Sequence, residues 1–466
     1  MRVAEEPALR GLGALPVRPW PGRFRSRLHS ARTSARDSTW LLPVVGAVVG
    51  AGLAVLFVVE PFGIRPSWIR GLAWRASMED SRRILASMLG IVITTLSIAL
   101  SLSLIVLQNT SSNYSPRLLR LFMRDRGSRL LLPVFVATGV YCLVGGYAFG
   151  FVEEPGEQPR PALGMAMLLL VCCGAALVFE TTYTLSMVRA EQIVRRVRRS
   201  SLEVARTLDL LRRRETEASA LPPVPSGAWQ VAAPCSGFVV DVDTRALLVL
   251  AVARGLSIHL DIAIGEPVVR GASLARLVSE GAPREKEQLA RCVERAVLIG
   301  PWRTPDRDLA LGVRQLVDVA IKALSPGIND PSTAVESVDQ LTVLLCELCR
   351  LRQGPRVLAD AQGRPRVFLR ALELRDYLVL ATEQIGRYGA GEPAVVLRLL
   401  RLAGEVGLRV SGEPDQRAVR EVLHQLSASA KAASPSLSAL MLRYAEEVER
   451  ALERQEPLPP LPSLGY

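Results

Sequence analysis

The stretch from residue 303 to residue 331 contains the side chains best suited to bind a polar ligand. It reads RTPDRDLALGVRQLVDVAIKALSPGINDP, and its candidate ligand-binding residues are Arg303, Asp308, Arg314, Asn329 and Asp330. Guanidinium groups bind carboxylates and phosphates through paired hydrogen bonds, and an amide offers both donors and acceptors. One hypothesis is therefore a polar pocket around Asn329 and Asp330, with Arg303 or Asp308 close by.

The same motif also predicts a turn between two helices. Proline cannot continue a helix, and Gly327 tolerates a positive φ angle. Pro331 disfavours helical geometry in Asp330, whose carboxylate would then cap the next helix while Pro331 occupies its first turn. The predicted cap and hinge residues are Ser325, Pro326, Gly327 and Pro331. This helix-hairpin interpretation explains every residue of the turn except Asn329, so both interpretations stay open.

Two helices must position this motif. Thr304 and Pro305 are typical of a helix start, with a capping hydroxyl followed by a proline in the first turn. Along the helix that follows, Arg314 and Asp318 are separated by four residues and lie on one side. A second amphipathic helix is predicted from residue 331 to residue 351.

Four apolar stretches are long enough to cross a bilayer, which needs ~20 residues for a ~30 Å hydrocarbon core. They cover residues 40–59, 84–107, 130–151 and 163–188. Thr94, Ser97 and Ser101 lie along one side of the second stretch, and Glu180 is an acid inside the fourth. Hydroxyls in this position either line a polar pathway or form hydrogen bonds to neighbouring helices. Glu180 either takes part in an ion relay or extends its carboxylate to the membrane–water interface.

The charges of the connecting loops predict the orientation, because arginine-rich short loops remain cytoplasmic. Residues 1–39 carry eight arginines and residues 108–129 carry five, whereas residues 152–162 carry three glutamates and one arginine. Residues 60–83 are discordant, since their five arginines must lie outside if the number of spans is even. We expect a multi-pass protein of the bacterial inner membrane with both termini in the cytoplasm.

The predicted fold is a four-helix transmembrane bundle followed by a cytoplasmic α+β region. That region combines a small barrel-sandwich-like β module with a helical bundle. The expected order is a basic cytoplasmic tail (1–39), the transmembrane domain (40–188), a helical stalk (189–222), the β module (223–285), a helical domain with the SPGINDP motif (286–454) and a proline-rich tail (455–466) expected to be disordered.

The β module contains GEPVVRGASL, which resembles the turn-and-strand pattern of biotinyl and lipoyl domains. Those domains carry their cofactor on a lysine, and Lys286 lies outside this module. We therefore expect no cofactor. Cys346 and Cys349 form a single CxxC on a predicted helix, so buried thiols are favoured over structural zinc.

The order of parts, and above all RQLVDVAIKALSPGINDPSTA, resembles a family of predicted bacterial membrane proteins, domain of unknown function 2254. The resemblance covers about residues 40–450. Upstream of the motif, this chain has Arg307 before Asp308, where the family pattern implies a glutamine. The resemblance implies the architecture and brings no established activity.

Three classes of function remain. The chain lacks a P-loop, a nucleophile elbow and a zinc set, and its three histidines are scattered, which disfavours an enzyme. The formal charge of +12 arises beside the apolar stretches, without the interleaved aromatic residues typical of nucleic-acid binding. We favour a membrane-anchored scaffold or sensor that binds a cytoplasmic protein or small molecule, with a gated oligomeric channel or transporter as the alternative. The expected partners are the bilayer and a possible second copy of the chain.

Overall fold

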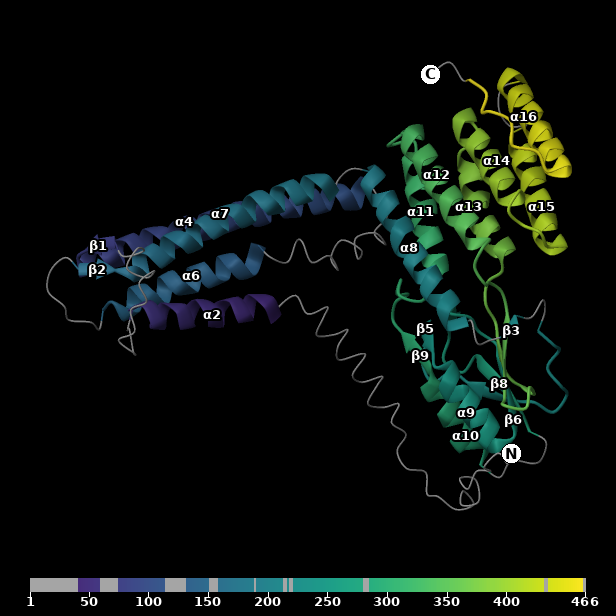
Figure 1. The fold of residues 1–466 in the computed structure, drawn as a ribbon, viewed down its shortest axis with the longest axis horizontal. Helices are drawn as coiled ribbons and strands as arrows, with labels where there is room; N and C mark the ends of the chain where they lie inside the picture. Colours follow the sequence, from purple (N-terminus) through teal and green to yellow (C-terminus); the bar gives the residue numbers. More distant parts are fainter. Residues whose placement is uncertain are drawn as a thin grey trace, which may run out of the picture. The chain divides into compact units, whose positions relative to one another are not determined.

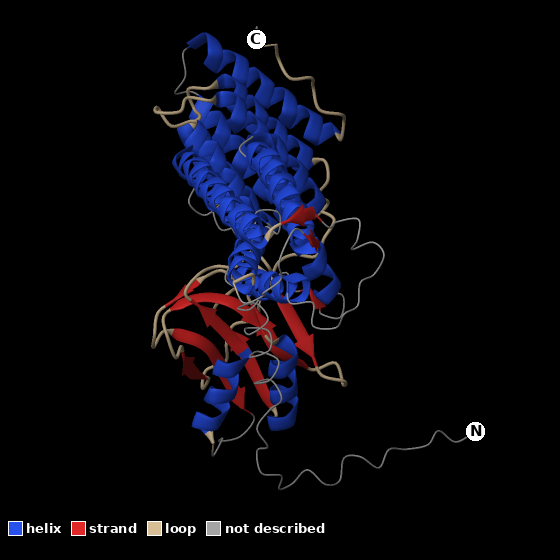
Figure 2. Cartoon of the chain, turned by 90° about the vertical axis from the view of Figure 1, so that its left-hand side faces the viewer, coloured by secondary structure: helices blue, strands red, loops and turns tan. Residues whose placement is uncertain are grey.

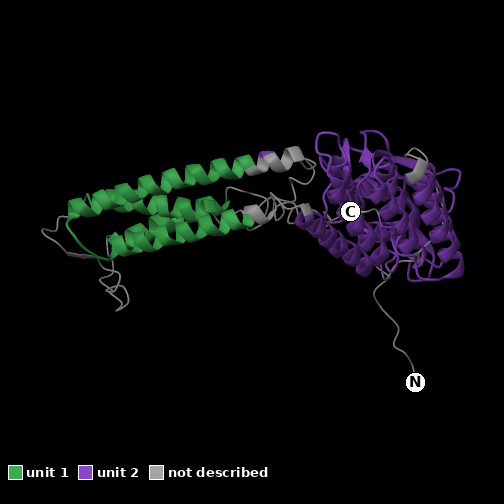
Figure 3. Cartoon of the chain, turned by 90° about the horizontal axis from the view of Figure 1, so that it is seen from above, with its two compact units in different colours: residues 1–106, 120–185 green, residues 107–119, 186–466 purple. Residues whose placement is uncertain are grey.

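The computed structural model describes residues 41–58, 74–113, 131–150, 158–187, 190–212, 216–217, 221–279, 285–430 and 435–463. The chain divides into two compact units, coloured separately in Figure 3. The first unit contains residues 1–106 and 120–185, and the second contains residues 107–119 and 186–466. The predicted basic tail, residues 1–39, lies outside the described residues.

Among the described residues, the first unit contains four helices that are long and apolar enough to span a membrane. They are α2 (Leu41–Val58), α4 (Met78–Asn113), α6 (Leu131–Ala148) and α7 (Pro161–Met187), shown in Figure 1. Large apolar side chains point outward, and Val48 and Val171 are each 68% exposed. Such a surface suits hydrocarbon, because soluble proteins rarely expose contiguous apolar patches of this kind. The four predicted spans are confirmed as candidate membrane helices.

Glycines allow α2 to approach α6 closely. A Cβ atom at Gly46 would lie 2.5 Å from the carbonyl oxygen of Pro133, and one at Gly50 would lie 2.1 Å from that of Ala137. Neither distance leaves room for a side chain, so the first GxxxG motif brings the two backbones together. A Cβ atom at Gly146 meets no described atom within 4 Å. Gly146, which forms a second GxxxG motif with Gly150, therefore makes no such close contact with the described part of the chain.

Two short strands tie the connecting loops together. Strand β1 (Trp74–Ala76) pairs antiparallel with β2 (Gln158–Arg160), and Trp74 lies opposite Arg160. The segment before α4 and the segment before α7 thus meet at the same end of the bundle. This pairing agrees with helices that cross the membrane in alternating directions, because the first and third connections then share one side of the membrane.

In its described residues, the second unit contains two sheets, whose strands are red in Figure 2. The larger sheet has the order β3-β10-β11-β6-β8-β4 and the smaller has the order β7-β5-β9. The strands are β3 (Thr216–Glu217), β4 (Trp229–Ala232), β5 (Gly237–Val242), β6 (Leu256–Leu260), β7 (Pro267–Val268), β8 (Ser273–Ser279), β9 (Val297–Gly300), β10 (Arg356–Ala359) and β11 (Pro365–Leu369). All pairs are antiparallel except β6 with β11, which is parallel.

This β region extends beyond the predicted module, residues 223–285. Helix α9 (Thr244–Arg254) and helix α10 (Lys286–Ala296) share one apolar core with both sheets, including Leu247, Val293 and Val297. Strands β10 and β11 form a hairpin that turns at Gly363, and they join the larger sheet although residues 286–454 were predicted to form a helical domain. The observed mixed sheet gives no support to the barrel-sandwich detail.

The remaining elements of the second unit form a helical bundle. They are α8 (Ala190–Arg212), α11 (Leu309–Ala323), α12 (Pro331–Leu348), α13 (Leu374–Tyr388), α14 (Pro393–Gly407), α15 (Glu413–Ala430) and α16 (Pro435–Arg454). Helix α8, the predicted stalk, packs on α11 and α12. A Cβ atom at Gly312 would lie 2.0 Å from the Ser201 hydroxyl, and Arg198 donates to the Gln340 side chain at 2.6 Å. The helix is therefore a packed member of the bundle.

Candidate functional site

The turn between α11 and α12 is built by its own backbone and by one carboxylate. Asp330 accepts hydrogen bonds from the Thr333 backbone N–H at 3.1 Å and from the Thr333 hydroxyl at 2.5 Å. The Asp330 N–H donates to the Ala323 carbonyl at 2.9 Å, which joins the two helix ends. Asp330 is thus the N-cap of α12 and Pro331 its first residue, as predicted.

Asn329 has a backbone role in this turn. Its φ angle is 50°, in the left-handed region, where asparagine is tolerated better than most residues with a Cβ atom. Its N–H donates to the Ser325 carbonyl at 2.9 Å, and its side chain is exposed. Gly327 tolerates a positive φ angle but does not adopt one here, and Asn329 is the residue of the turn that does so.

A buried ion pair lies at the other end of α11. Arg303 donates to both carboxylate oxygens of Asp308, at 2.6 and 2.8 Å. The same carboxylate accepts from the Leu311 N–H at 3.0 Å, and its side chain is 3% exposed. The predicted helix start at Thr304 and Pro305 was wrong, because Asp308 caps the helix and α11 begins at Leu309. One carboxylate therefore caps the helix and holds the arginine.

Gly265 brings the β region against this ion pair. Its φ angle is 90°, and a Cβ atom there would lie 2.5 Å from an Asp308 carboxylate oxygen and 3.0 Å from an Arg303 guanidinium nitrogen. Tyr377, on α13, is also buried near the pair, and burial raises the pKa of its phenol. Sequence reasoning missed both residues, because nothing in their local pattern indicates a distant ion pair.

The structure does not bring the predicted ligand-binding residues into one place. Asp308 precedes the first residue of α11 and Asn329 follows its last, and 15 residues of helix at 1.5 Å per residue span roughly 22 Å. Arg314 lies on the first half of the same helix, where it pairs with Asp318 at 3.0 Å. The expectation that Asn329 lies near Arg303 or Asp308 is therefore wrong.

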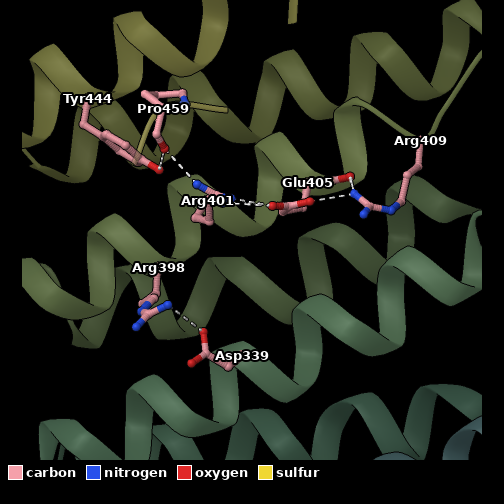
Figure 4. Close-up of polar contacts among 7 residues, drawn as sticks. All are labelled: Asp339, Arg398, Arg401, Glu405, Arg409, Tyr444 and Pro459. Carbon is pink, nitrogen blue, oxygen red and sulfur yellow. Dashed lines mark hydrogen bonds and ion pairs between the residues drawn. The ribbon is translucent and has the colours of Figure 1, made fainter. Parts of the chain in front are cut away.

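A second polar group lies among α12, α14 and α16, and Figure 4 shows its contacts. Glu405 lies between two guanidinium groups, with Arg401 at 2.9 Å and Arg409 at 2.7 Å. Burial opposes the charge of Glu405, but hydrogen bonds from Arg409 and Arg401 outweigh it and hold the pKa of this carboxyl below its usual range. Nearby, Arg398 pairs with Asp339 at 3.4 Å.

The proline-rich tail is held by this group. Arg401 donates to the Pro459 carbonyl at 2.8 Å, and the Tyr444 hydroxyl donates to the same oxygen at 3.4 Å. A Cβ atom at Gly404 would lie 2.9 Å from the Leu458 side chain. The expectation of disorder was wrong for residues 455–463, which lie on α14 and α16.

The cysteines of the CxxC sequence are partly buried in the helical bundle. Cys346 and Cys349 lie at the end of α12, and burial raises the pKa of their thiols to about 11 and about 12. Thiols with such high pKa values stay protonated at neutral pH, which disfavours nucleophilic chemistry. Within the described ranges, no group of three or more histidine, cysteine or acidic residues is arranged to hold a metal ion.

The polar residues of the spans bond within their own helices. Thr94, Ser97 and Ser101 each donate to the carbonyl oxygen four residues earlier, at 2.8 to 2.9 Å, and their side chains face outward from the unit. Glu180 is buried on α7. Arg189, a candidate partner for this carboxylate in the sequence, lies outside the described residues.

Comparison with known proteins identifies the kind of chain. A family model described as "Predicted membrane protein (DUF2254)" matches residues 36–404. The chain belongs to this family. Uncharacterized proteins of Mycobacterium tuberculosis strain H37Rv and of Mycobacterium bovis are each 30% identical over 443 residues, which cover 92% of this chain and 83% of theirs. No solved structure matches the chain.

In this DUF2254 protein, the motif that carried the resemblance forms a helix hairpin. Residues 314–334 occupy most of α11, the turn and the start of α12. The two ends of α11 hold separate polar groups, each satisfied by capping, by backbone hydrogen bonds or by an ion pair. This arrangement can fix the second unit's shape, and the geometry itself indicates no bond-making chemistry.

Proposed function

We propose that the protein is a membrane-anchored scaffold or sensor. Its four spans would hold the chain in the bacterial inner membrane, and residues 186–466 would form a cytoplasmic unit that binds a partner protein or a small ligand. The observation that supports this proposal is the hydrogen bonding of Thr94, Ser97 and Ser101 to carbonyls of their own helix. Hydroxyls satisfied in this way require no aqueous pathway beside them.

The arginine distribution supports the cytoplasmic location of both termini, because residues 1–39 and 108–129 are rich in arginine. The β1–β2 pairing joins the segments before α4 and α7, so the arginine-rich first connection and the acidic third connection share one side of the membrane. The proposed orientation therefore rests on the arginines of residues 1–39 and 108–129 and on the acidic residues 152–162. Membership of a family of predicted membrane proteins supports the anchoring role.

An oligomeric channel or transporter is the second candidate. The hydroxyls of α4 face outward in a single chain, so they would line a path only between copies of the protein. Such a path would exist only in an oligomer. Its hydroxyls would have to form hydrogen bonds with permeating water or solute in addition to those with the helix carbonyls.

Flux through reconstituted protein separates the two candidates. Purified protein is placed in liposomes, and ion and glycerol movement are recorded against protein-free liposomes and against liposomes that contain an ionophore. The scaffold or sensor proposal predicts flux equal to that of protein-free liposomes. Protein-dependent flux that falls in the triple variant Thr94→Val, Ser97→Ala, Ser101→Ala would overturn it.

A further inference from the structure

A depression of about 520 Å³ lies between α13 and α15 on the second unit. Polar side chains line it, namely Arg375, Arg417, Arg420, Glu421, His424 and Gln425. Its size lies within the range of small-molecule sites, ~300–1,000 Å³. All six lining residues carry polar or charged groups, so the depression offers hydrogen bonds and charge, while the aliphatic stems of these side chains add apolar surface.

The spacing on α15 gathers the basic residues on one side. Arg417, Arg420 and His424 follow at intervals of three and four residues, which places them on adjacent turns of one helix face. Arg375, near the start of α13, completes the set from the facing helix. Helix packing therefore brings three guanidinium groups and an imidazole together.

The acidic residues nearby neutralise only part of this charge. Glu421 pairs with Arg375 at 3.0 Å, and Glu413 pairs with Arg417 at 3.1 Å. Arg420 has no acidic partner within 4.0 Å in the described part of the chain, and its side chain is exposed. A guanidinium group in that position keeps its paired N–H donors available for a planar or tetrahedral oxyanion.

We propose that this depression binds a compact phosphoryl anion, with Arg420 as the principal contact and Arg417, His424 and Gln425 as further donors. The lining residues offer positive charge and hydrogen-bond donors, so the anionic group itself is what the site recognises. A free diphosphate and the headgroup of an acidic lipid share this chemistry. The proposal rests on the proposed function, in which the second unit binds a ligand.

Calorimetric titration of the full-length protein in neutral detergent tests the site. Sodium pyrophosphate at low ionic strength represents a free anion, and short-chain phosphatidic acid represents a lipid source. We expect at least one of the two to bind, and Arg420→Gln to weaken that binding about tenfold or more, as loss of a charge-assisted hydrogen bond predicts. Arg420→Lys keeps the positive charge but lacks the paired N–H donors of the guanidinium group, so it should retain part of the affinity.

The matched control is Arg245→Gln, which removes the same charge from an exposed arginine on α9. It should bind like the wild type. Failure of the wild type to bind either probe, or equal affinities for Arg420→Gln and Arg245→Gln, would overturn the site. Liposome flux is a separate measurement. Channel activity would contradict the scaffold or sensor proposal without touching the anion site. Anion binding that does not depend on Arg420 would contradict the site without touching that proposal.

Discussion

Asn329 and Asp330 differ in how far their roles followed from the sequence. The cap at Asp330 was predictable, because a proline directly after an acid both excludes helical backbone at the acid and starts the next helix. The left-handed residue was not predictable, since glycine and asparagine both adopt that conformation and Gly327 lies two positions away. Which of them does so depends on how the turn closes onto Ser325 and Ala323.

Replacement of Asp330 tests the cap. Asp330→Ala removes the acceptor for the Thr333 N–H and should lower the free energy of unfolding by about 1 kcal/mol. Asp330→Ser keeps an oxygen acceptor and should retain most of that stability. Thermal or denaturant unfolding of the purified protein measures both, and equal losses in the two variants would argue against capping.

Replacement of Asn329 separates its backbone role from a pocket role. Asn329→Gly should leave stability unchanged or slightly improved, because glycine adopts a φ angle of 50° without steric cost. Asn329→Val should cost about 1–2 kcal/mol, since a left-handed backbone is unfavourable for L-residues with a Cβ atom. If Asn329→Gly instead abolished partner or ligand binding at an unchanged melting temperature, the original pocket hypothesis would be restored.

At the scale of elements, long periodic or apolar segments were predictable and distant pairings were not. The four spans and helices α12 to α16 follow from runs of apolar residues or from helical spacing, which are local signals. The parallel pairing of β6 with β11 joins residues more than a hundred positions apart, and neither strand indicates its partner. For the same reason, the local sequence around Gly265 does not indicate its contact with the Arg303–Asp308 pair.

The protonation of His259 can be used to test the parallel pairing of β6 with β11. It is buried on β6 and stacks on Phe368 of β11, with ring centroids 4.1 Å apart. Burial, and then the charge of Arg276, lower the pKa of His259, while Asp261 opposes them. Between the ordinary pKa of 6.5 and the lower folded value, the unfolded chain binds the proton more readily, so stability falls as the pH drops through that window.

Exchange of His259 for phenylalanine should remove this dependence while it keeps the stacked ring. The wild type should lose stability below pH 6.5 with a slope of up to about 1.4 kcal/mol per pH unit from this one group. His259→Phe should show a shallower decline, measured by unfolding between pH 8 and pH 5. Identical slopes in the two proteins would show that the pairing of β6 and β11 does not bury a neutral imidazole.

At the scale of the whole molecule, the sequence predicted an apolar part with four spans and a mixed α/β part, and the structure contains both units. The predicted boundaries within the second part differ from the observed groups of elements. The predicted stalk packs into the bundle, and the hairpin and α10 belong with the sheets, because the shared core rather than chain order defines these groups. The tail residues 455–463 lie on the bundle through Leu458 and Pro459, contacts that a proline-rich composition does not indicate.

If the protein is a membrane anchor with a cytoplasmic binding unit, Cys235 must lie on the cytoplasmic side of the membrane. This cysteine is free and exposed in the second unit, so a membrane-impermeant maleimide labels it wherever the reagent has access. Cys235→Ser identifies its share of the label, and Gln158→Cys, on the strand before α7, reports the opposite side. We expect the reagent to label Cys235 in inside-out vesicles but not in intact cells, and to label the cysteine of Gln158→Cys in intact cells but not in inside-out vesicles. Labelling of Cys235 in intact cells would contradict the cytoplasmic location.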